Sequence, residues 1–132
     1  MDDCVLKLDG IFFDSINFKR LGSPKKNDKN ELELSLSVNI GVSESEPDVK
    51  KVSLKMIGEK KDEYYFDVQV SGFFVYEGDA NDTIISQNTA AILMPYLRSE
   101  ISLLTAQPSM EPVVIPPLNI AAMIEESKMQ NN

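Results

Sequence analysis

The amino-acid sequence predicts an α+β fold, in which a four-stranded antiparallel sheet is followed by a long kinked helix and a short C-terminal helix. Three observations support this prediction. Apolar and polar residues alternate over four segments of the first half, apolar residues then recur at helical spacing, and a proline-rich stretch follows. Because a chain of 132 residues buries one core but not comfortably two, we expect one domain over residues 1–132, with 130–132 as a frayed tail.

The first three predicted strands show the period of two that is typical of half-buried strands. Residues 4–18 alternate with slips at Gly10 and near Asp14, and such slips predict β-bulges in one long strand. Residues 31–40 and 52–56 alternate without interruption. The short polar turn between these two segments favours antiparallel pairing.

The fourth predicted strand begins at Tyr64. Its phase is expected to slip at Ser71–Gly72, so that Phe73 and Val75 carry the apolar side onward. Adjacent aromatic residues in a strand point to opposite faces, so one member of each pair joins the core and the other faces solvent, a subunit or a ligand. The aromatic residues of the first and fourth strands are Phe12, Phe13, Phe18, Tyr64, Tyr65, Phe66, Phe73, Phe74 and Tyr76.

The long helix is predicted to begin near Asn81, where polar side chains are available to cap it. Pro95 lies inside the helical pattern and should kink or restart the helix, because proline lacks the backbone donor. A second apolar stripe of Ile92, Tyr96 and Leu103 runs beside the first. This apolar surface is wider than one sheet contact needs, so we expect the helix to be covered on two sides.

Prolines hold residues 107–118 extended, and Asn119 is placed to cap the short helix expected over residues 120–129. Met110 and Met123 belong to this C-terminal part of the chain. Methionine side chains are flexible and adapt to apolar partners of different shapes.

Composition excludes several function classes. The formal charge of -8 disfavours nucleic acid and anionic membrane surfaces as partners, although it also keeps a protein soluble. The chain has no histidine, one cysteine (Cys4) and no glycine-rich phosphate loop, so the usual catalytic triads, zinc sites and nucleotide sites cannot be assembled. We therefore expect a protein without enzymatic activity or cofactor. The acidic start at Asp2 and Asp3 and the lack of a membrane-spanning apolar run predict a cytoplasmic protein.

Three stretches resemble one family, the SecB protein-export chaperones. Residues 92–101 (ILMPYLRSEI) resemble its helix signature, residues 67–74 (DVQVSGFF) its fourth strand, and residues 115–119 (IPPLN) the approach to its last helix. The order of four strands, long helix, extended segment and short helix is also similar to the family's. The resemblance covers nearly the whole chain.

This resemblance implies an ATP-independent holdase, which binds unfolded preproteins in apolar grooves and keeps them competent for export and translocation. It implies a homo-oligomer, a dimer of dimers (homotetramer), with Ile92, Tyr96 and Leu103 at the interface between subunits. The groove residues expected from the family's architecture and from the aromatic pairs are Phe12, Tyr65, Phe74, Met110 and Met123.

The resemblance also implies docking of the translocase motor SecA on acidic positions of the first and fourth strands. Asp67 matches the fourth-strand position, whereas Ser15 and Lys19 stand at the first-strand positions. SecA docking is therefore the part of the family's function that this sequence departs from.

Two other functions remain open from the sequence. A SecB-like chaperone attached to a toxin-antitoxin system would hold an aggregation-prone antitoxin in the same grooves. A structural adaptor would instead recognise one folded partner through its sheet, and its aromatic residues would be buried in the oligomer. A toxin and antitoxin in the gene neighbourhood favour the first, and weak binding of hydrophobic dyes favours the second.

Overall fold

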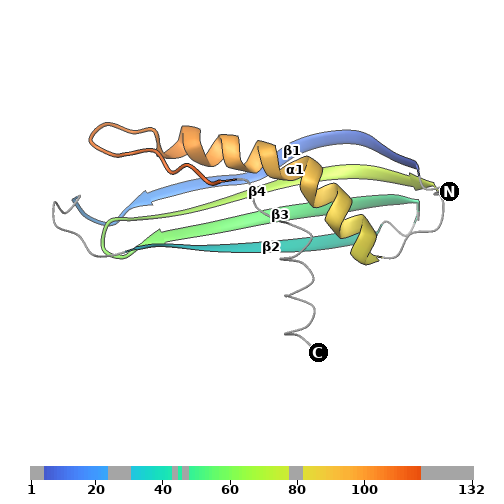
Figure 1. Cartoon of the computed structure of the whole chain (residues 1–132), viewed down its shortest axis with the longest axis horizontal. Coiled ribbons are helices and arrows are strands. Elements are labelled where there is room, and N and C mark those ends of the chain that lie inside the picture. Colours follow the sequence, from blue (N-terminus) through green and yellow to red (C-terminus); the bar gives the residue numbers. More distant parts are fainter. Residues whose placement is uncertain (1–4, 24–30, 43–44, 46–47, 78–81, 117–132) are drawn as a thin grey trace, which may run out of the picture.

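The computed structural model describes residues 5–23, 31–42, 45, 48–77 and 82–116. Four long strands form one antiparallel sheet: β1 (Val5–Arg20), β2 (Leu32–Val42), β3 (Val49–Lys60) and β4 (Tyr64–Glu77). They are followed by a single long helix, α1 (Asp82–Thr105), which crosses one face of the sheet (Figure 1). The predicted α+β class, with four antiparallel strands before a long helix, is confirmed.

The strand order is β1-β4-β3-β2, so β4 and β3 are central and β1 and β2 are the edge strands. β1 pairs with β4 through register shifts between Leu8 and Gly10 and between Phe13 and Ser15. These shifts confirm the two predicted bulges. β2 pairs with β3 in one continuous register from Leu32 to Val42, as the uninterrupted alternation predicts.

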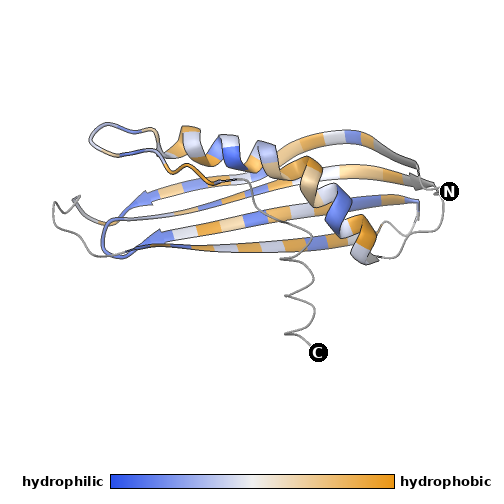
Figure 2. Cartoon of the chain, in the orientation of Figure 1, coloured by the Kyte–Doolittle hydropathy of each residue, from blue (hydrophilic) through white to orange (hydrophobic). Residues whose placement is uncertain are grey.

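The core lies between α1 and one face of the sheet, which we call the inner face. Its centre consists of buried side chains from β3, β4 and α1, including Leu54, Phe66, Val70, Leu93 and Leu97. In Figure 2 apolar and polar residues alternate along the strands, because successive side chains point to opposite faces. Burying the apolar half of that alternation against α1 is what stabilises this arrangement.

The expected phase slip at Ser71–Gly72 is wrong. β4 pairs with β3 in one register, so Phe74 points to the inner face and Phe73 to the outer face, the face away from α1. The sequence pattern is broken because Gly72 provides no side chain on the inner face. A Cβ atom at Gly72 would lie 2.7 Å from the Phe74 ring and 3.0 Å from Leu93, which occupy that space.

Helix α1 continues through Pro95 as one element of 24 residues. It does not restart at the proline, and its axis changes direction part-way along, in agreement with a kink (Figure 1). The segment after α1 folds back along it. The Ser102 hydroxyl donates to the carbonyl of Val113 (2.9 Å), and the Arg98 Nε donates to the carbonyl of Ile115 (2.8 Å). The predicted helix over residues 120–129 lies outside the described residues.

Candidate functional site

The outer face of the sheet carries an aromatic pair that no other described element covers. Phe12 of β1 and Phe73 of β4 pack with ring centroids 5.5 Å apart. The Phe12 side chain is 40% exposed, whereas its neighbour Phe13 is partly buried against the core. The sequence predicts this division within each aromatic pair, because adjacent residues of a strand point to opposite faces.

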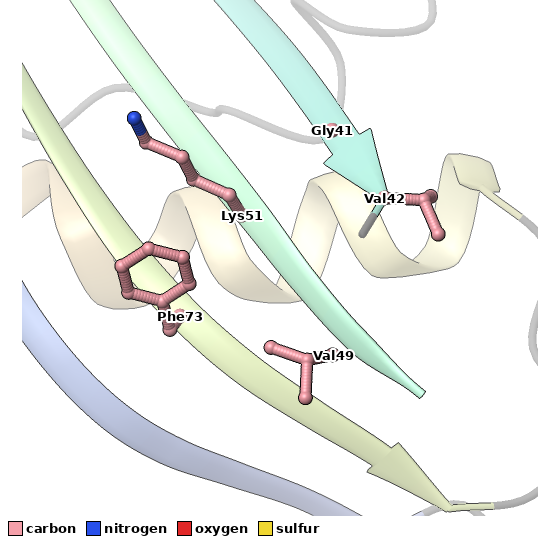
Figure 3. Close-up of a pocket in the computed structure, with 5 residues that line it drawn as sticks. All are labelled: Gly41, Val42, Val49, Lys51 and Phe73. Atoms are coloured by element: carbon pink, nitrogen blue, oxygen red, sulfur yellow. The ribbon is translucent and has the colours of Figure 1, made fainter. Parts of the chain in front are cut away.

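Beside this pair the surface is hollowed, with a volume of about 260 Å³. We call this depression the outer-face hollow. It is lined by Gly41, Val42, Val49, Lys51 and Phe73, which come from β2, β3 and β4 (Figure 3). Among the described residues that line it, all but Lys51 are apolar, so the hollow suits an apolar group that is accompanied by an anion.

A hydrogen-bonded carboxylate supports one wall of the hollow. Asp14, at the second bulge of β1, accepts hydrogen bonds from Gln69 Nε2 (2.9 Å) and the Ser71 hydroxyl, and it lies 3.6 Å from Lys51 Nζ. Burial opposes the charged form of Asp14, but the two hydrogen bonds and Lys51 outweigh that effect and lower its pKa below the usual value. Lys51 Nζ also lies 5.7 Å from the centre of the Phe12 ring, a cation–π contact.

The other end of the outer face is acidic. Asp67 accepts hydrogen bonds from the Tyr65 hydroxyl (3.3 Å) and Asn17 Nδ2 (3.4 Å). Burial and the Asp67 carboxylate raise the pKa of the Tyr65 phenol above its usual value. Ser15 and Lys19 of β1 pair with Gln69 and Tyr65 and so lie on this face near Asp67.

The five residues predicted to form a groove do not lie together. Phe12 and Tyr65 are on the outer face, as their positions in the strands require. Phe74 is fully buried beneath α1, so the prediction that it faces a groove is wrong, and the error follows from the phase slip expected at Ser71–Gly72. Met110 packs against the core, and its sulfur accepts from Arg20 Nη2 at 3.6 Å. Met123 lies outside the described residues.

The second helical stripe faces away from the sheet. Ile92, Tyr96 and Leu103 are all exposed, and Leu103 is 68% exposed, while Leu93 and Leu97 of the first stripe are buried. Helix α1 thus has apolar side chains on two sides, and the sheet covers one of them. That the other side is covered as well stays a prediction.

The outer-face hollow was not predicted from the sequence. The position of Phe73 could have been found from the alternation along β4. Tyr65, Asp67 and Gln69 stand at every second position on the outer face, and Phe73 continues this series once Gly72 is counted as an inner-face position. Lys51 and Val49 carry no signal of their own, because a lysine and a valine at alternate positions are ordinary in an exposed strand.

Two findings concern the described residues alone. No group of acidic, cysteine or histidine side chains among them is arranged to hold a metal ion. Among the same residues, no helix has the length and apolar character needed to cross a membrane. What the described surface offers is apolar contact and a few charged side chains.

The model of one family, SecB (preprotein translocase subunit SecB), matches residues 2–131 of the chain. The chain belongs to the SecB family. A curated relative, the uncharacterized protein MJ0357 of Methanocaldococcus jannaschii, is 35% identical over 139 aligned positions, which cover 97% of this chain and 90% of the relative. The resemblance predicted from the sequence is thereby confirmed at the level of the family.

Solved structures agree with this assignment of the fold. The SecB-like chaperone Rv1957 of Mycobacterium tuberculosis, in complex with a ChAD peptide from the Rv1956 HigA1 antitoxin, superposes with a TM-score of 0.70 at 15% identity. That match covers 86% of this chain and 87% of the other. A protein of unknown function from Streptococcus agalactiae matches with a TM-score of 0.50 at 13% identity, covering 86% and 98% of the two chains.

Proposed function

We propose that this chain is an ATP-independent holdase, which binds unfolded polypeptide segments through apolar side chains left outside its core. One observation carries the proposal: large apolar residues are exposed on both sides of the molecule, in a chain of the SecB family. On the outer face Phe12 is 40% exposed and packs on the partly buried Phe73. On the other side the exposed residues include the stripe of Ile92, Tyr96 and Leu103, which we assign to the contact between subunits, and residues of the edge strands.

The inner face adds to this exposed apolar surface. Leu8 and Ile16 of β1 and Leu34 of β2 belong to the face that α1 covers, but they lie on the edge strands and remain more than two-fifths exposed. Contacts of this kind accept any apolar sequence, because burial of apolar area is not directional. Promiscuous binding of extended clients, with no chemistry done on them, is the function that such a surface supports.

An antitoxin is a second candidate client. The structure of Rv1957 contains a peptide from an antitoxin, and this chain has the same fold over most of its length. Binding one antitoxin and binding many preproteins use the same kind of apolar surface. The two are distinguished by whether the protein prefers a single client over unrelated unfolded chains at equal concentration.

Delivery to SecA and assembly into a dimer of dimers are further parts of the proposal. Asp67 is the residue we assign to SecA docking, and Lys19 stands close to it on the same face, which weakens an acidic docking surface. Ile92, Tyr96 and Leu103 are assigned to the contact between subunits. Leu103→Asp should lower the oligomer mass measured by light scattering, because a charge in an apolar interface is unpaired.

The proposed function is tested by aggregation of a chemically unfolded, reduced model substrate in the absence of nucleotide. The purified chain should suppress light scattering when it is present at about one oligomer per substrate molecule. Phe73→Ser should suppress less, and Ser37→Ala, an exposed outer-face change on β2, serves as the control.

Failure of a well-folded oligomer to suppress aggregation would contradict the holdase. The chain would then be an adaptor for one folded partner, and its exposed aromatic residues would serve assembly. Suppression that competes with an antitoxin peptide but not with unrelated unfolded chains would instead support the narrower role.

A further inference from the structure

The outer-face hollow differs from the rest of the outer face in both shape and charge. We infer that it is a binding site for one large apolar side chain of an extended polypeptide segment that carries a carboxylate beside it. This inference rests on the proposed peptide-binding function and specifies a site and a sequence preference for it. The occupant is an acidic-apolar segment of a client.

The size and lining of the hollow define the apolar part of the ligand. An apolar cavity of about 150 Å³ is large enough to bind a benzene molecule, and the hollow has a volume of about 260 Å³. It therefore has room for one phenylalanine or branched aliphatic side chain. Val42 and Val49 contribute aliphatic walls, and Phe73 contributes an aromatic face against which such a side chain packs.

Gly41 keeps the hollow open. A Cβ atom built on Gly41 meets nothing nearer than the carbonyl oxygen of Lys51 at 3.9 Å, which is an ordinary contact distance. No side chain in the part of the chain that the structure describes therefore occupies the space next to this strand position. A larger residue would fit at position 41 without strain and would project into the space that the ligand needs.

The charge of the ligand is inferred from Lys51, the one charged residue among the described residues that line the hollow. Its side chain is 43% exposed, and its ammonium group has three donors. The ammonium group lies 3.6 Å from a carboxylate oxygen of Asp14, and Asp14 in turn accepts hydrogen bonds from Gln69 and Ser71. Lys51 is thus positioned by a fixed carboxylate and can donate to a second one from a ligand.

The distribution of charge along the outer face supports the same preference. By register, Lys51 and Lys55 of β3 point to this face at the end that carries the hollow and in its middle, and Asp14 lies beside Lys51. Glu59 and Asp67 lie toward the other end, where Lys19 is also present. A carboxylate beside the bound apolar side chain would be attracted at the hollow and repelled at the acidic end. A lysine in the same place would meet Lys51, so the site discriminates between the two charges.

The test uses the full chain and three short synthetic peptides, with affinities measured by calorimetry. The first has one phenylalanine flanked by glutamates, the second has the same phenylalanine flanked by lysines, and the third has glutamates around a glycine. The wild type should bind the first peptide about tenfold more tightly than either of the others, because each of those lacks one of the two interactions.

Three variants locate the binding. Gly41→Val fills the hollow and should weaken binding of the glutamate-flanked phenylalanine peptide by about tenfold. Ser37→Val is the matched control, since Ser37 lies on the same strand and the same face but does not line the hollow, and its affinity should match the wild type. Lys51→Met keeps the apolar stem and removes the charge, so it should bind the glutamate- and lysine-flanked peptides equally.

Equal binding of the first two peptides by the wild type would overturn the inference, as would unchanged affinity of Gly41→Val. The aggregation assay on the same variants separates this result from the proposed function. If the wild type suppresses aggregation but Gly41→Val binds all peptides normally, the hollow is not the site and the holdase stands. If the peptide preferences hold but aggregation is not suppressed, the binding site at the hollow is supported and the proposed holdase function is wrong.

Discussion

The inner and outer faces of the sheet are built from the same strands but differ in burial. On the inner face Phe66, Phe74 and Leu54 are fully buried beneath α1. On the outer face Phe12 and Phe73 pack on each other beside an open hollow. Phe73 and Phe74 are adjacent in the sequence, so a step of one residue separates a core position from a candidate binding position.

The role of an aromatic residue in this sheet, in the core or at the surface, is set by the face to which it points. Residue type and neighbouring sequence are nearly the same for Phe73 and Phe74. The difference comes from α1, which covers the inner face and excludes water from it. Stability should therefore depend on inner-face residues, and binding on outer-face residues.

The largest effect is expected from a charge at the centre of the helix contact. Leu97→Asp should destabilise the protein by at least about 4 kcal/mol, because Leu97 is fully buried and the new carboxylate would have no partner. Chemical denaturation measures this change. The control is Leu103→Asp on the exposed stripe, which should cost less, because it leaves the core of the subunit unchanged and removes only the proposed contact between subunits. Equal destabilisation by both would contradict the assignment of the two helix faces.

The next effect compares the adjacent aromatic residues directly. Phe74→Ala should cost about 3–5 kcal/mol of stability, as is usual for truncating a buried phenylalanine. Phe73→Ala should cost roughly 1 kcal/mol, because its ring is only partly buried, and it should weaken peptide binding instead. Urea denaturation and calorimetric titration of both variants check this. The comparison fails if Phe73→Ala is the more destabilising change.

A smaller effect is expected from filling glycine positions on the two faces. The Phe66 ring lies over Gly58, so a side chain there would overlap it, and Gly58→Val should destabilise by about 1–3 kcal/mol. Gly41→Val on β2 should be neutral or slightly stabilising, because the space beside it is open and valine favours strands. Thermal unfolding of the two variants measures the difference, and equal melting temperatures would show that the inner face adapts to overpacking.

The smallest effect concerns the pH dependence of the outer-face network. The pKa of Asp14 is lowered in the folded protein, so its stabilisation is present above the carboxyl group's unfolded pKa and is lost as the pH falls through the folded pKa. Asp14→Asn should cost about 1 kcal/mol or less at neutral pH. The difference from the wild type should begin to shrink as the pH falls to about 4, the usual value for an aspartate, and should vanish only below the lowered folded pKa. Denaturation at several pH values tests this, and a difference that grows on acidification would contradict it.

Much of the fold could be predicted because it depends on local patterns. The period of two located the strands, the slips near Gly10 and Asp14 located both bulges of β1, and helical spacing located α1. These patterns can be read from a single sequence, because the pleat of a strand and the pitch of a helix are properties of the backbone.

By itself the sequence determined the fold class, the family and the rule that adjacent aromatic residues divide between the two faces. Only the tertiary structure decided which member of the last pair is buried, because Gly72 leaves a gap in the pattern that Phe74 and Leu93 fill from the same strand and from α1. It also decided that Gly41, Val49, Lys51 and Phe73 line one hollow. These residues come from three strands, and their proximity depends on strand order and register, which no local pattern encodes.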